Sequence, residues 1–218
     1  MIDSISHIIS PLSAPWCGWV LFGLLLCVVL SEYMQPGIVR LAYVSLIARS
    51  ERTYKDAPVN LYGQILIFLF RLGTLAMGIS ICLYNGSTFS IAVFGIVFGL
   101  VLATLLVKLL CNKWLDYTFS LSRRYMPMHE QYGDLSTIAC TFLFLGIMIV
   151  MHTGRLALAP WILGGATALF VLMCLYRVTL HYVQSPMGML YVLIYIVSLE
   201  VLPLGVLYFL CSKTIASL

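Results

Sequence analysis

Residues 60–83 read NLYGQILIFLFRLGTLAMGISICL, and Arg71 is the one charged residue among them. A helix rises about 1.5 Å per residue and needs about 20 mainly apolar residues to cross the hydrocarbon core of a bilayer. This stretch is long enough and apolar enough to do so. It therefore predicts a transmembrane helix with one basic side chain at its centre.

Other apolar runs of similar length lie along the chain. Together with the first they predict about six membrane-spanning helices, at about 14–31, 60–83, 88–111, 134–152, 158–180 and 187–211. The 218 residues are 62% hydrophobic and 9% charged, whereas a soluble domain carries about 25% charged residues. We therefore expect an all-α fold, a polytopic membrane helix bundle that forms one transmembrane domain over residues 1–218.

The basic residues predict the orientation of this bundle. With six spans both termini lie on one face, and only Arg155 and Lys213 flank that face. The positive-inside rule assigns the more basic face to the cytoplasm, so we expect both termini on the outer side. That side is the periplasm if the membrane is the inner membrane of a diderm bacterium. The basic residues that flank the predicted cytoplasmic face are Arg40, Arg49, Arg52, Lys55, Lys108, Lys113, Arg123, Arg124 and Arg177.

Two charged residues are predicted to lie in the middle of the membrane. Arg71 is central in 60–83, and Glu200 is central in 187–211. An unpaired charge at that depth costs at least about 2.5 to 3.5 kcal/mol. Both helices run in the same direction in the six-helix arrangement, so the two side chains lie at similar depths. We therefore expect an Arg71–Glu200 ion pair across neighbouring helices.

Further polar residues accompany Arg71 on the second predicted helix. Asn60, Gln64 and Thr74 recur at spacings of three, four or seven residues with Arg71, so all four share one helical face. Because polar side chains are costly in contact with lipid, we expect this face to point into the bundle.

The last predicted helix carries a proline beside its acidic residue. Pro203 has no amide hydrogen to donate, so a kink is expected next to Glu200, with Tyr195 nearby. Two interpretations stay open. Arg71 and Glu200 are either a buried pair that fixes the helix register, or the carboxylate lines a cavity and binds a proton or a substrate.

Small residues and one amphipathic segment add two structural expectations. Gly95, Gly99 and Ala103 form a narrow ridge on the third predicted helix, where a neighbouring helix can approach closely. Packing within the chain is the favoured interpretation of this ridge, and dimerisation is the alternative. Residues 38–49 alternate apolar and basic side chains and predict a short interfacial helix, unless they extend the first span.

The sequence offers no signature of an enzyme, a metal site or a nucleic-acid interface. No HExxH, GxSxG, Walker lysine loop or GxGxxG occurs, and the cysteines and histidines are scattered without ligand spacing. We therefore expect no metal and no cofactor. The net charge of +4 arises from residues beside membrane spans, so it indicates topology and not a nucleic-acid partner. The expected surroundings are the lipid bilayer and other membrane or envelope proteins.

The C-terminal segment also carries a resemblance. The pattern Tyr195, Glu200 and Pro203, a Tyr-x4-Glu-x2-Pro motif, resembles the closing helix of a family of small polytopic inner-membrane proteins of unknown function from Bacteroidota. The polar second helix, with Asn60 and Gln64, is similar too. The resemblance implies an inner membrane and an uncharacterised role.

These expectations leave three classes of function. The leading one is a non-enzymatic subunit or assembly factor in cell-envelope biogenesis or secretion, because the chain offers helices and no catalytic set. The alternative is a small proton-coupled carrier that uses Glu200 and Arg71. The second alternative is a lipid-modifying membrane enzyme, which rests only on Arg177, His181 and Glu130 near the predicted cytoplasmic surface.

Overall fold

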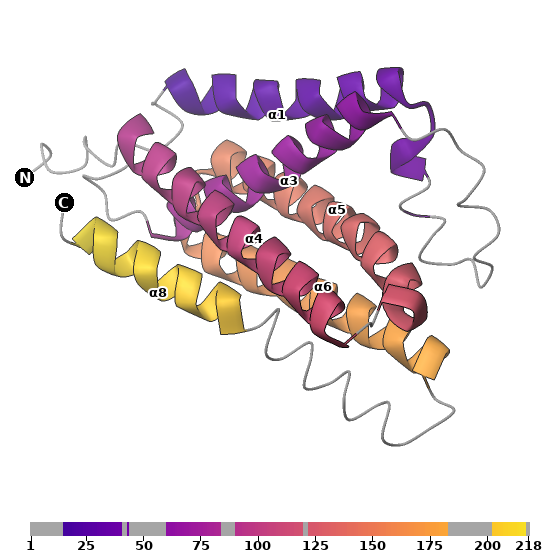
Figure 1. Ribbon diagram of the computed structural model, residues 1–218. Helices are drawn as coiled ribbons and strands as arrows, with labels where there is room; N and C mark the ends of the chain where they lie inside the picture. Colours follow the sequence, from indigo (N-terminus) through magenta and orange to yellow (C-terminus); the bar gives the residue numbers. More distant parts are fainter. Residues whose placement is uncertain are drawn as a thin grey trace, which may run out of the picture.

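The computed structural model describes residues 15–40, 43, 60–83, 90–119, 122–182 and 202–216. These residues form helices and no strand, which confirms the predicted all-α membrane bundle (Figure 1). Within these described residues, five helices are long and apolar enough to cross a membrane. The elements are α1 (Pro15–Met34), α3 (Leu61–Cys82), α4 (Ile91–Phe119), α5 (Ser122–Thr153), the 3-10 turn η3 (Leu156–Leu158), α6 (Ala159–Tyr182) and α8 (Leu202–Ala216).

The helices overlap the predicted spans to different extents. α1, α3, α4, α5 and α6 each contain most or all of one of the first five predicted ranges. Of the sixth range, 187–211, only the part from Leu202 onward is described, where α8 begins. Of the predicted interfacial segment 38–49, residues 38–40 are helical and Tyr43 is helical, and the others lie outside the described residues.

Helix α3 is the central element of the bundle. It packs against α1, α4, α5 and α6, and Figure 1 shows α1 lying across it on one side while α4, α5 and α6 surround the other. Of its candidate span, 61% is buried, against 17% of the α4 span. The helix first identified from its apolar sequence is therefore the one around which the others assemble.

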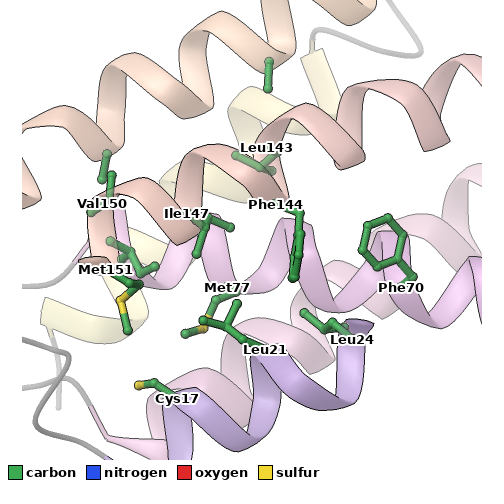
Figure 2. Packing of buried hydrophobic residues seen from close by; sticks show 13 residues of the cluster. Cys17, Leu21, Leu24, Phe70, Met77, Leu143, Phe144, Ile147, Val150 and Met151 are labelled. Atoms are coloured by element: carbon green, nitrogen blue, oxygen red, sulfur yellow. The ribbon is translucent and has the colours of Figure 1, made fainter. Parts of the chain in front are cut away.

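Apolar side chains form clusters on different sides of α3. One cluster joins α1, α3 and α5, and Figure 2 shows Leu21 and Leu24 of α1 facing Met77 of α3 and the face of α5 that carries Phe144 and Ile147. A second cluster joins α3 and α4 to α8, where Leu207 and Cys211 meet Val97. Different residues of α3 contribute to the two clusters, so the rotation of α3 about its own axis is well defined.

Two glycines allow close helix crossings. A methyl group added at Gly73 of α3 would overlap Leu24 of α1, and one added at Gly146 of α5 would overlap Ile162 of α6. By contrast, no atom lies within 4 Å of a methyl group added at Gly95 or Gly99, and Ala103 is exposed. In the described part of the chain, therefore, the ridge on α4 does not serve the packing that the sequence suggested.

The C-terminal end of α1 is tied to the start of α3. The backbone amides of Gly37 and Val39 donate to the Glu32 carboxylate, at 2.6 and 3.2 Å, and Gly37 has a φ of 88° that favours glycine. Asn60 caps α3 by accepting from the Tyr62 amide, and its Nδ2 donates to the Met34 carbonyl at 3.0 Å. The Asn60–Met34 bond holds the C-terminal end of α1 beside the start of α3.

Candidate functional site

Arg71 of α3 is bound to the neighbouring helix α5. Its Nη1 donates to the carbonyl oxygen of Gly133 at 3.0 Å and to the hydroxyl of Ser136 at 2.8 Å. The guanidinium also lies 5.9 Å from the centre of the Phe68 ring, within range of a cation–π contact. The side chain is only half-buried. A basic group in an apolar helix is thus held by neutral oxygens of the adjacent helix.

The side chain of Arg71 runs along α5 toward the N-terminus of that helix. The Cys140 thiol donates to the backbone oxygen of Arg71 at 3.8 Å, which places the Arg71 backbone beside Cys140. The guanidinium, however, meets Gly133, seven residues earlier, or about 10 Å along the helix. Gly133 is the first residue of the apolar part of α5. The positive charge therefore lies near the end of the α5 span, although the Arg71 backbone is central in α3.

The carbonyl of Gly133 is the common acceptor of this cluster. Besides Arg71, the hydroxyls of Ser136 and Thr137 donate to it, at 2.7 and 2.9 Å. Gly133 also lies so close to the guanidinium that an added methyl group would stand 3.4 Å from Nη1. Ser136 both donates to this carbonyl and accepts from Arg71, so the three residues form one connected hydrogen-bond network.

Thr74 continues the polar surface of α3 one turn beyond Arg71. Its neighbours on the same face meet α5, because Arg71 contacts Ser136 and Gly78 packs against Leu143. The Thr74 side chain is completely buried, at 0% exposure, and its hydroxyl has no hydrogen-bond partner within the described part of the structure. We call the set Arg71, Thr74, Gly133, Ser136, Thr137 and Cys140 the Arg71 seam.

The other residues singled out from the sequence fall in different places. Asn60 is half-buried and caps α3, whereas Gln64 is exposed, so the expected inward face of α3 points outward at that position. Glu200 and Tyr195 lie outside the described residues, and so does the predicted ion pair. Pro203 is the second residue of α8, and the kink expected beside residue 200 also falls outside the described part.

The sequence did not point to the α5 side of the seam. Gly133, Ser136, Thr137 and Cys140 are small residues, common in apolar helices, and none carries a charge. Their spacing of three and four residues was a signal, since it places them on one face of a helix. Among the described residues, no group of three or more His, Cys, Asp or Glu side chains gathers where a metal ion would bind.

The chain was compared with known families, curated proteins and solved structures. The family model described as "Domain of unknown function (DUF4271)" matches residues 17–210. No curated protein and no solved structure matches the chain. The matched range runs from α1 into α8 and includes the whole Arg71 seam. Since it spans most of the sequence, the chain belongs to the DUF4271 family of unknown function.

Proposed function

We propose that this multi-pass membrane protein is a non-enzymatic subunit or assembly factor, working in the inner membrane of a Gram-negative bacterium of the Bacteroidota type. Its task in this proposal lies in envelope biogenesis or secretion. The proposal places both termini in the periplasm, following the distribution of basic residues. The chain's role is then to bind other membrane proteins through its helices.

The observation that carries this proposal is the open ridge on α4. A glycine inside a helix costs about 1 kcal/mol relative to alanine, and a methyl group added at Gly95 or Gly99 would have no atom within 4 Å. No contact in the described part of the chain requires either residue to be glycine. A helix from another protein that packs on this ridge would require both, because glycines at this spacing let two backbones approach.

The bonds of Arg71 support the same proposal in a different way. Its two hydrogen bonds to α5 give the side chain a structural task, which is to hold α3 against α5. Under the carrier hypothesis, Arg71 instead has to exchange partners during a transport cycle. Hydrogen bonds that hold two helices together suit a rigid subunit better than a carrier whose helices move during transport.

The test is a comparison of two substitutions in the native host. Gly99→Leu fills the ridge on α4, and Gly18→Leu makes the same change on α1 at a position that is equally open. We expect the wild-type chain and Gly18→Leu to migrate with a larger complex after mild solubilisation and crosslinking. Gly99→Leu should accumulate in the membrane but lose that complex. A wild-type chain that is monomeric and crosslinks to nothing refutes the proposal.

One observation favours the carrier as a second candidate. The buried hydroxyl of Thr74 and the half-buried guanidinium of Arg71 place polar groups where a bundle held together by packing alone needs none. In that case Glu200 supplies the titrating carboxylate. Glu200→Gln must then abolish the pH dependence of solute flux into vesicles that contain the purified protein. An unchanged pH dependence removes this candidate.

A further inference from the structure

The polar groups of the Arg71 seam follow one another along the contact between α3 and α5. They begin at the Gly133 carbonyl, where the apolar part of α5 starts, and continue through Ser136 and the guanidinium. The Cys140 thiol lies next, against the Arg71 backbone. Thr74, three residues beyond Arg71 on α3, is the last polar residue of the seam.

Exposure changes along this row. Gly133, Ser136, Arg71 and Cys140 are all half-buried, so each has some surface in contact with the surroundings. Of the other two seam residues, Thr137 is buried at 5% exposure and Thr74 is completely buried. The row therefore leads from an accessible end, near the start of the α5 span, to an enclosed hydroxyl.

The Thr74 hydroxyl requires an explanation of its own. A buried polar group without a hydrogen-bond partner is destabilising, and such groups in native structures are usually satisfied by bound water or a ligand. A threonine in a helix ordinarily bonds to the carbonyl one turn earlier, as Thr137 and Thr141 do in α5. Thr74 makes no such bond within the described structure.

We infer that the Arg71 seam is a hydrated site, in which water enters beside Gly133 and reaches the hydroxyl of Thr74. Water there donates to and accepts from the groups that line the seam, and it solvates the guanidinium near the end of the α5 span. The inference does not depend on a partner protein, so it stands apart from the proposed function.

Two native cysteines, Cys140 and Cys174, can serve as the probe of water in the seam and as its control. Cys140 lies in the seam, whereas Cys174 of α6 is 2% exposed in an apolar cluster with Phe170 and Met173. The two lie at similar depths, about 20 Å from the end of α5 and about 22 Å from the start of α6 at the same membrane face. The two thiols therefore differ in burial and in the polarity of their surroundings, but not in depth.

The experiment keeps these two thiols in one molecule and labels them with N-ethylmaleimide in membrane vesicles. The cysteine thiolate attacks the carbon–carbon double bond of the maleimide, and the thiolate forms where water can solvate it. The rate at each cysteine is read from its own peptide by mass spectrometry, and a detergent-denatured sample gives complete labelling of both. The cysteines replaced by alanine are Cys17, Cys27, Cys82, Cys111 and Cys211.

We expect Cys140 to react at least about tenfold faster than Cys174 in the folded protein. Thr74→Val should slow the reaction of Cys140 several-fold, and Thr74→Ser, which keeps the hydroxyl, should not. A variant that fails to fold is recognised because both thiols then react fast. Equal and slow rates at Cys140 and Cys174 in the folded protein overturn the inference. An unchanged Cys140 rate in Thr74→Val overturns the assignment of water to Thr74.

Discussion

The crossing of α5 and α6 at Gly146 makes a quantitative prediction. A methyl group at this position would overlap Cγ2 of Ile162 and stand 3.4 Å from its Cβ. Isoleucine is β-branched and therefore stiff about χ1, so it cannot easily turn away. Overpacking of this kind costs about 1 to 3 kcal/mol, while alanine gains about 1 kcal/mol of helix propensity over glycine. Taking the upper part of the range, Gly146→Ala should lower the free energy of unfolding by about 2 kcal/mol.

Gly95 of α4 is the matched control for this substitution. It also lies inside a helix, but nothing stands within 4 Å of an added methyl group. Gly95→Ala should therefore raise the free energy of unfolding by up to about 1 kcal/mol. The same chemical change thus has opposite signs at the two positions, and the difference of about 3 kcal/mol measures the overlap with Ile162.

The assay is equilibrium unfolding in mixed micelles with a rising fraction of denaturing detergent. A double-mutant cycle with Ile162→Ala adds a direct test, because removal of the isoleucine should relieve the overlap. We expect a coupling free energy of at least about 1 kcal/mol between the two positions. The reasoning is refuted if Gly146→Ala stabilises the protein as Gly95→Ala does, or if the effects of Gly146→Ala and Ile162→Ala simply add.

Three further predictions concern polar contacts and one backbone angle. Arg71→Met and Ser136→Ala should be non-additive in their free energies of unfolding by about 0.5 to 2 kcal/mol, since both remove the same hydrogen bond. Strict additivity would argue against this hydrogen bond. Asn60→Ala should lower the free energy of unfolding by about 1 to 2 kcal/mol. Asn60→Asp should lower it less, because the carboxylate still caps α3 although it no longer donates to the Met34 carbonyl. Equal losses in the two variants would mean that the cap is unimportant. Gly154→Ala should lower the free energy of unfolding by about 1 to 2 kcal/mol, because the φ of this glycine is 67°. Thermal unfolding measures the loss, and an unchanged unfolding temperature would show that the turn can rearrange.

Much of the helical framework was predictable because apolar length is a strong signal in membranes. The run around Arg71 identified α3, and on the polar face expected to point into the bundle Thr74 is buried while Arg71 is half-buried and binds Ser136 of α5. The same spacing failed at Gln64, which is exposed. Periodicity defines a face of a helix, but how far along the helix that face is covered depends on where its neighbours lie.

Close helix packing was harder to predict. Gly95 and Gly99 form the more conspicuous pattern, yet the close contacts in the described structure are made by Gly73 and Gly146, which stand singly. A glycine permits close approach, but only the position of a second helix decides whether the approach occurs. In the same way, the α5 half of the Arg71 seam consists of small neutral residues, whose importance depends on the arginine that reaches them.

The contact between Arg71 and Ser136 joins residues 65 positions apart in the sequence. Ribosomes add about 5 to 20 residues per second, so Arg71 is synthesised roughly 3 to 13 s before Ser136, whose hydroxyl accepts its hydrogen bond. During that interval the charged helix needs another stabilising environment, such as the insertion machinery or the headgroup region of the lipid. Because the two partners lie far apart in the sequence, α3 can take its final place in the middle of the bundle only after α5 has been made.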